Sequence, residues 1–181
     1  PYQGGVLENR TREYMVDDQR FASTRPDVMV YETDILTEDI TITGPVINHL
    51  FVSSTGTDAD YVVKLIDVYP ENTPKFNDKL MGGYQNLIRA EIMRGKYRNS
   101  FSTPEALVPN KKTDVTYTMP DVGHTFKKGH RIMIQVQNSW FPLADRNPQQ
   151  FMNVYEATAK DFIKQTQRIY HDSYIEIPVL K

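Results

Sequence analysis

Hydrolysis by a serine nucleophile needs a sharp turn from strand to helix, written Gly-x-Ser-x-Gly, with a histidine base close by. The 181 residues contain no such pentad. We interpret the following serines as turn residues, because no helix follows them: Ser53, Ser54, Ser100, Ser102, Ser139 and Ser173. The glycines also lack the spacing of phosphate-binding loops. The sequence therefore predicts no catalytic residue and no glycine-rich nucleotide site.

Histidines are the next candidates for chemistry, as metal ligands. They are too far apart in sequence for the i, i+4 ligand pair of a zinc protease: His49, His124, His130 and His171. We interpret His49 and His124 as surface or turn residues. His130 and its neighbour Arg131 open a strand, which favours turn and strand-edge contacts over acid–base work.

One pair of carboxylates offers oxygen ligands for calcium. Asp58 and Asp60 lie at the end of a turn. The loop lacks the glycine at its sixth position and the closing glutamate at its twelfth that a calcium loop requires. A solvated turn is the favoured interpretation, and the sequence predicts neither a metal ion nor another cofactor.

Aromatic residues gather near two predicted loops. Trp140 and Phe141 adjoin one of them, and Tyr69 and Tyr84 adjoin the other. Exposed aromatic rings would form a platform for sugars, whereas buried rings would pack in the core or at an interface. An aromatic anchor followed by an arginine is typical of a buried contact, and this loop continues with Asp145, Arg146 and Asn147. Packing or a domain interface is therefore favoured over a sugar platform.

Composition excludes several classes of function. Lysine and arginine number 21 against 23 acidic residues, so no field of one sign favours nucleic acid or anionic lipid. The absence of cysteine excludes disulfides, thiolate zinc sites and cysteine nucleophiles. No apolar run reaches the roughly 18 residues of a membrane span, and no signal-peptide pattern opens the chain. The compartment stays open between secreted, periplasmic and cytoplasmic.

The elements that must position these residues are predicted by hydrophobic alternation of period two, which is typical of half-buried strands. Strands are expected around residues 28–35, 40–42, 46–52, 61–66, 88–92, 115–119, 132–136 and 175–179. Turns are expected at Gly44-Pro45 and at residues 120–123, and a long surface loop at residues 70–86. Residues 155–164 are the one predicted helix. The pattern predicts an all-β protein, a sandwich or jelly roll with one short helix.

Asp67 shares its strand parity with the apolar residues at positions 61, 63 and 65. That parity predicts a buried carboxylate, which needs partners inside the fold. Arg89 and Arg131 are the partners that we expect, so all three residues are predicted to be structural.

Short motifs occur in a fixed order along almost the whole chain: Val30-Tyr31-Glu32-Thr33, Thr43-Gly44-Pro45, Leu65-Ile66-Asp67-Val68-Tyr69-Pro70, Gly129-His130-Arg131-Ile132, and Phe141-Pro142 with Asp145-Arg146-Asn147-Pro148. Through these motifs, residues 25–180 resemble the C-terminal domain of the X-Pro dipeptidyl-peptidase, cocaine esterase and glutaryl-cephalosporin acylase family of serine hydrolases. The chain departs from that family at Glu71-Asn72-Thr73, where relatives carry Asp-Gly after the proline.

The resemblance implies a jelly roll of the galactose-binding type that follows an α/β-hydrolase domain and a helical cap in a longer chain. The catalytic Ser, Asp and His of the family lie upstream, so it also implies that this domain is non-catalytic. The parent would be a dipeptidyl-peptidase, acylase or esterase that hydrolyses an amide or ester through an acyl-serine. We expect residues 1–25 to be a linker or extended N-terminal segment and residues 26–181 to be the sandwich.

The expected task is to pack on the hydrolase and cap domains and to help shape their substrate pocket. Candidate contact residues are Tyr69, Trp140, Phe141, Asp145, Arg146 and Asn147. For Asp145 and Arg146, an internal salt bridge or turn hydrogen bond is an equal alternative. A carbohydrate-binding module and an oligomerisation module are the alternative functions. The substrate and the oligomeric state stay open.

Overall fold

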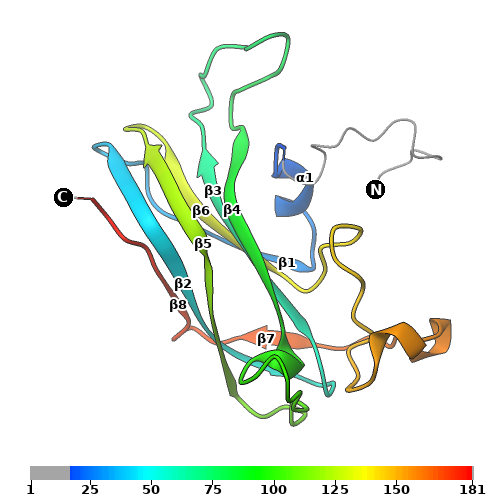
Figure 1. Cartoon of the computed structure of the whole chain (residues 1–181). Coiled ribbons are helices and arrows are strands. Elements are labelled where there is room, and N and C mark those ends of the chain that lie inside the picture. The colour runs from blue at the N-terminus through cyan, green and yellow to red at the C-terminus, as the bar shows by residue number, and fades with distance from the viewer. Residues whose placement is uncertain (1–16, 181) are drawn as a thin grey trace.

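The computed structural model describes residues 17–180 as two packed antiparallel sheets (Figure 1). Sheet A has the strand order β1 (Val28–Glu32), β6 (Arg131–Gln137), β3 (Asp60–Val68) and β4 (Gln85–Arg94). Sheet B has the order β5 (Thr113–Phe126), β2 (Ile40–Ser54) and β7 (Gln167–Ile169), with β8 (Tyr174–Glu176) also paired to β2. The predicted all-β sandwich is confirmed.

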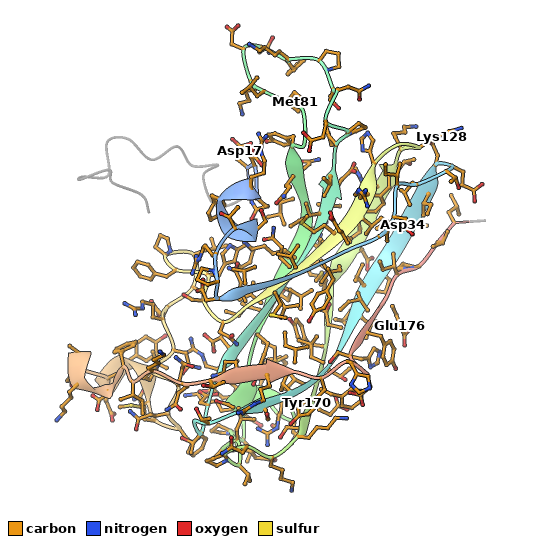
Figure 2. The ribbon with its side chains drawn as sticks, turned by 180° about the vertical axis from the view of Figure 1, so that it is seen from behind. Asp17, Asp34, Met81, Lys128, Tyr170 and Glu176 are labelled. Atoms are coloured by element: carbon orange, nitrogen blue, oxygen red, sulfur yellow. The ribbon has the colours of Figure 1, made fainter. Side chains whose placement is uncertain are left out.

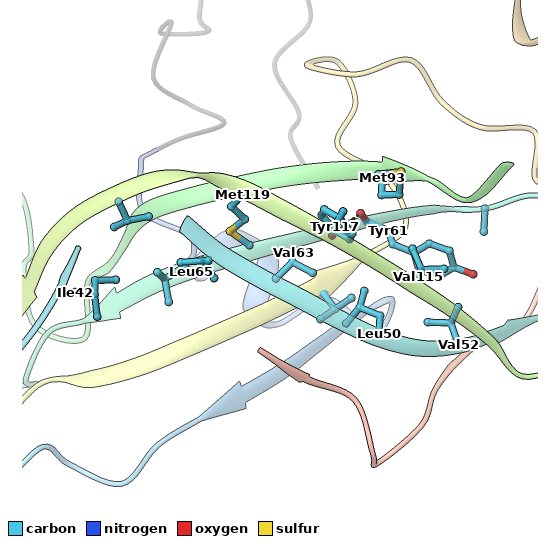
Figure 3. Close-up of a cluster of buried hydrophobic side chains, with 14 of the residues drawn as sticks. Ile42, Leu50, Val52, Tyr61, Val63, Leu65, Met93, Val115, Tyr117 and Met119 are labelled. Carbon is cyan, nitrogen blue, oxygen red and sulfur yellow. Dashed lines mark hydrogen bonds between the residues drawn. The ribbon is translucent and has the colours of Figure 1, made fainter. Parts of the chain in front are cut away.

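The core lies between the sheets, because alternate residues of the long strands point inward. Figure 3 shows these side chains, which come from β2, β3, β4 and β5: Ile42, Leu50, Val52, Tyr61, Val63, Leu65, Met93, Val115, Tyr117 and Met119. Full burial of an aliphatic or aromatic side chain contributes about 1.5–3 kcal/mol. Tyr117 keeps its polar end satisfied, since its hydroxyl donates a 2.9 Å hydrogen bond to the carbonyl of Tyr61.

Two predicted turns are wrong, because strands pass through them. Strand β2 runs unbroken across Gly44-Pro45, and its register against β5 shifts between Gly44 and Val46. This β-bulge accommodates the proline, which has no N–H to donate, and Gly44 adopts the φ of +117° that the bend requires. Strand β5 likewise continues through Pro120 to Phe126. Pro120 lies in the bulge itself, where it and Asp121 face Pro45, and β5 is an edge strand that tolerates a proline.

The predicted helix over residues 155–164 is also wrong. The segment forms two separate 3₁₀ turns, η3 (Val154–Glu156) and η4 (Ala159–Asp161). Ala157 and Thr158 between them are extended, and Thr158 shares a capping box with Asp161 that begins a new turn. A capping residue in the middle of the predicted helix therefore begins a new turn and prevents one continuous helix. A third 3₁₀ turn, η2 (Gly95–Tyr97), follows β4.

The α-helix of the structure is α1 (Arg20–Ser23), a single turn in the segment predicted as a linker. Gln19 and Ala22 are fully buried against sheet A. Residues 1–16 of the predicted linker lie outside the described residues, so the expected boundary at residue 25 stays a prediction. Within residues 17–180, no helix has the length and apolar character needed to cross a membrane.

Candidate docking surface

The outer face of sheet A, which points away from the core, is covered by side chains of this domain. Val62, Lys64 and Ile66 of β3 point to that face and are nevertheless fully buried. Helix α1 and the start of the β6–β7 connection lie over them: Lys64 Nζ is 5.5 Å from the ring centroid of Phe21 and 5.6 Å from that of Trp140. The two covering segments thus meet above Lys64.

Trp140 is a packing residue. Its exposed fraction is 8%, and it contacts Val62, with Leu87, Ala90 and Ile92 packed around the pair. Little of the indole is left for a sugar or for another domain. This burial agrees with the favoured prediction of packing. It also leaves the indole ring of Trp140 inaccessible as a stacking surface for a sugar.

Lys64 is a buried cation that holds α1 on the sheet. Its ammonium donates a 2.9 Å hydrogen bond to Gln19 Oε1 and lies near the faces of the two rings. None of the ion pairs found among residues 17–180 includes Lys64. Burial, and to a smaller degree the charge of Arg25, lowers the pKa of Lys64 to about 8.

Asn147 closes the loop that Trp140 opens. Its amide donates to Asp58 Oδ2 at 3.1 Å and to Asp60 Oδ1 at 2.7 Å, and the side chain is buried. Arg94 completes the cluster with a 2.9 Å ion pair to Asp60. Asn147 is therefore an internal anchor whose side chain points into its own domain.

The two carboxylates correct a sequence expectation, because Asp58 and Asp60 are fully buried and do not form a solvated turn. Burial raises the pKa of Asp58, although hydrogen bonds from Asn147 and from the Lys96 backbone oppose the shift. The apolar pattern gave no sign of this burial, since it depends on donors from two distant segments, residues 94–96 and Asn147. Across the described part of the chain, no group of three or more histidine or acidic side chains is placed to hold a metal ion.

Between its two anchors, the loop presents apolar side chains to solvent. We call residues 141–148 the docking loop. Phe141 is 56% exposed and Leu143 is 58% exposed, and the Phe141–Pro142 peptide is cis. Asp145 and Arg146 are exposed as well: the Asp145 carbonyl accepts a hydrogen bond from Arg94, and the Arg146 guanidinium lies 5.3 Å from the Phe162 ring centroid.

Asp67 is buried as predicted, but its expected partners are wrong. Its two carboxylate oxygens pair with His130 Nδ1 at 2.7 Å and with His124 Nε2 at 3.0 Å. Arg89 instead donates to the Asp121 carbonyl, and Arg131 donates to the Thr33 carbonyl. Because a turn was predicted at residues 120–123, the continuation of β5 to His124 and its alignment with Asp67 were not visible in the sequence.

Tyr69 lies at the opposite end of sheet A from the docking loop. Its ring contacts the rings of His130 and Tyr84, with centroid distances of 4.8 Å and 5.7 Å. Strand β3 has nine residues, so roughly 27 Å separates its Asp60 end from its Val68 end. The structure therefore assigns Tyr69 to the base of the loop at residues 70–84 and not to the neighbourhood of Phe141.

A groove at the open edge of the sandwich was missed by sequence reasoning. It has a volume of about 440 Å³ and lies between β1 and β6 of sheet A and β7 and β8 of sheet B. Its lining is mainly apolar, including Tyr31, Leu50, Ile134, Ile169, Tyr174 and Ile177. It exists because β7 and β8 have only three residues each and leave the facing sheet uncovered. No local pattern predicts such a mismatch.

Comparison with known proteins places these features in context. The family described as the X-Pro dipeptidyl-peptidase C-terminal non-catalytic domain matches residues 8–175. A cocaine esterase of Rhodococcus sp. (strain MB1 Bresler) is 31% identical over an aligned length of 185 residues, which takes in all of this chain and 30% of the esterase.

Two solved structures share the fold closely. An aminopeptidase from a marine sediment archaeon, Thaumarchaeota archaeon, superposes with a TM-score of 0.88 and 44% identity over 93% of this chain. An α-amino acid ester hydrolase superposes with a TM-score of 0.87 and 47% identity over 92% of it. In both cases the match takes in 28% of the larger protein. The chain thus spans less than a third of the proteins that it resembles.

Proposed function

Because the chain belongs to the family of X-Pro dipeptidyl-peptidase C-terminal non-catalytic domains, we propose that it packs on the α/β-hydrolase and cap domains of a larger serine hydrolase and helps to shape their substrate pocket. Its similarity to an esterase, an aminopeptidase and an ester hydrolase supports a parent that cleaves esters or amides. The nucleophile and its base would lie outside this chain.

The observation that carries the proposal is the docking loop. Trp140 before it and Asn147 within it are buried, while Phe141 and Leu143 between them are more than half exposed. A loop that is fixed at both ends loses little conformational entropy when it binds. The free energy gained from apolar contacts in its middle is therefore offset only slightly by the cost of ordering the loop. This arrangement suits a permanent contact with another domain.

The predicted contact residues then divide into three roles. Phe141, Asp145 and Arg146 stand on the exposed part of the docking loop and are the proposed contacts, together with Leu143. Trp140 and Asn147 hold the loop from inside the domain. Tyr69 acts at the other end of the sheet, where it braces a second loop.

The contribution to catalysis would be rigidity. Catalytic groups must be held within a fraction of an ångström of their productive positions, and a sandwich can brace pocket loops that do not brace themselves. The carbohydrate-binding alternative is not favoured, because the one tryptophan is buried. The oligomerisation alternative would use the apolar groove instead of the docking loop.

The test uses the full-length parent enzyme with Phe141→Ser and Leu143→Ser combined. We expect kcat/KM for a chromogenic ester to fall about tenfold, because a displaced domain no longer holds the pocket wall, and we expect the thermal midpoint to fall. Tyr174→Ser is the matched control, since Tyr174 is 51% exposed on sheet B. Unchanged kcat/KM and thermal midpoint in the double variant would refute the docking role.

Hydrolysis assays on the 181-residue chain and on the parent, side by side, test the non-catalytic part of the proposal. Chromogenic esters and X-Pro anilides are the substrates. Activity in the parent alone is expected. Turnover by the isolated chain, purified free of other hydrolases, would mean that it contains a nucleophile of its own.

A further inference from the structure

The loop at residues 70–84 projects beyond the ends of β3 and β4 and has an ordered tip (Figure 1). Phe76 and Lys79 exchange backbone hydrogen bonds of 3.1 Å and 2.9 Å. The two residues between them, Asn77 and Asp78, have φ values of +45° and +64°. These features are those of a two-residue hairpin turn of type I′. We call residues 76–80 the hairpin tip.

The hairpin tip exposes large apolar side chains. Phe76 is 65% exposed and Leu80 is 62% exposed. A flexible loop with scattered apolar residues would need no explanation. Here a turn of fixed shape holds two such side chains on a projection, and both remain more than half exposed.

The segment around α1 braces the loop at its base and along the second half of the hairpin tip. The Arg20 guanidinium donates to the carbonyls of Gly82 at 2.9 Å and of Leu80 at 3.2 Å. Lys79 pairs with Asp17 at 3.2 Å, and the Tyr84 hydroxyl donates to the same carboxylate. In Figure 2, Asp17 lies beside the base of the loop that carries Met81.

A second brace comes from sheet A. Asp67 binds His130, and the His130 ring contacts the Tyr69 ring. The Tyr69 ring in turn contacts that of Tyr84, and the Tyr69 backbone N–H donates a 2.9 Å hydrogen bond to the Tyr84 carbonyl. Gly82 adds a close backbone approach, because a Cβ atom at this position would lie 2.3 Å from the Glu71 carbonyl oxygen. The projection is therefore held at its base on both sides.

The position of the hairpin tip indicates its partner. In a C-terminal domain, the rest of the polypeptide precedes the domain, and it reaches this sandwich through Asp17, the first described residue. Asp17 itself contacts Lys79 and Tyr84 of the projecting loop. In the related solved structures, the domain makes up 28% of the chain. The tip thus lies close to Asp17, the point at which this domain is joined to the larger part of such a protein.

We propose that the hairpin tip inserts into an apolar socket on the hydrolase and cap part of the same polypeptide, with Phe76 and Leu80 as the inserted side chains. Lys79 lies within the tip, where its ammonium pairs with Asp17 outside the socket. The inference rests on the proposed function, because it takes the domain to be docked, but it uses a surface at the opposite end of sheet A from the docking loop.

Photo-crosslinking in the full-length protein tests the insertion. Benzoylphenylalanine replaces Phe76 in one variant, Leu143 in a second and Tyr174 in a third, which measures non-specific labelling. We expect the Phe76 probe to link to peptides of the hydrolase or cap part within one polypeptide. Links from the Leu143 probe alone would overturn the insertion and leave the docking loop in place, and links from neither would overturn both. Links between two copies would replace the proposed partner with a second subunit.

A stability measurement adds a readout without a bulky probe. Phe76→Ser with Leu80→Ser should lower the thermal midpoint of the full-length protein by about 3–6 °C, since two apolar side chains lose their burial. Lys75→Ser is the matched control from the same loop and should leave the midpoint unchanged. An unchanged midpoint in the double variant would overturn the insertion.

Discussion

Asn147 and Asp60 meet inside the domain, where the amide nitrogen of one lies 2.7 Å from a carboxylate oxygen of the other. This contact joins the end of the docking loop to the first residue of β3, at the same end of the sheet as Arg94. The docking loop is therefore tied at its buried end to β3, the most buried strand of the fold.

Replacing Asn147 by alanine should destabilise the domain by about 1–3 kcal/mol, because Asp58 and Asp60 would each lose a donor while they remain buried. Urea unfolding of the 181-residue chain measures the change. Asn99→Ala is the control, since Asn99 is exposed, and it should change the free energy of unfolding by less than about 0.5 kcal/mol. Equal effects of the two substitutions would mean that Asn147 is no anchor.

Trp140→Ala should cost about 3–5 kcal/mol, as expected for the removal of a large buried aromatic side chain. Trp140→Phe should recover much of this loss, because it refills most of the volume over Val62. Denaturant titration followed by circular dichroism gives both values. A ring that served only as a ligand platform would be exposed, and its removal would leave stability nearly unchanged, as we expect for Tyr155→Ala at an 89% exposed position.

His130→Ala should destabilise the domain by about 1–3 kcal/mol, because the buried carboxylate of Asp67 loses one of its two imidazole partners. Arg131→Ala is the neighbouring control, and we expect a smaller effect because Arg131 bonds to the Thr33 carbonyl near the surface. Chemical unfolding at neutral pH compares the two. A larger destabilisation by Arg131→Ala than by His130→Ala would indicate that Arg131, and not His130, is the partner of Asp67.

Stability should rise with pH through a window set by Lys64. Its pKa is about 8 in the fold and 10.5 in the unfolded chain, so between these values the unfolded state binds more protons than the folded state. Below pH 8 the folded state bears the full free-energy cost of burying the Lys64 charge. This cost disappears as the pH rises to about 10.5, because Lys64 is then neutral in the folded state. Relative to Lys64→Met, the wild type should gain up to about 3 kcal/mol across the window. Parallel pH dependence in the two proteins would show that Lys64 has an ordinary pKa.

The sequence was sufficient for the fold class and for most strands, because alternation in β5 and β6 reports which side chains face the core. It failed where a feature depends on tertiary partners. The bulge at Gly44-Pro45 looks like a turn until β5 is seen to pair across it, and the capping residue Thr158 is hidden inside a sequence of good helix formers.

The sequence places most of the candidate contact residues in one loop, but it does not say which of them are buried and which are exposed. Burial of Asp67 followed from its parity in β3, but its pairing with His130 needed the pairing of β3 with β6, and its pairing with His124 needed the packing of β5 from the other sheet. Trp140 and Phe141 are adjacent in sequence and yet face opposite ways, one into the sheet and one into solvent. Which of the two residues is buried depends on how the loop packs on the outer face of sheet A, and hydrophobic periodicity does not predict that packing.

Hydroxyl-radical footprinting tests the central claim most directly, by comparing the oxidation rates of Phe141 and Leu143 in the isolated 181-residue chain and in the full-length enzyme. We predict that both residues are protected severalfold in the full-length enzyme, while Tyr174 on sheet B reacts at the same rate in both. Equal rates for Phe141 and Leu143 in the two proteins would contradict the claim that this domain docks through that loop.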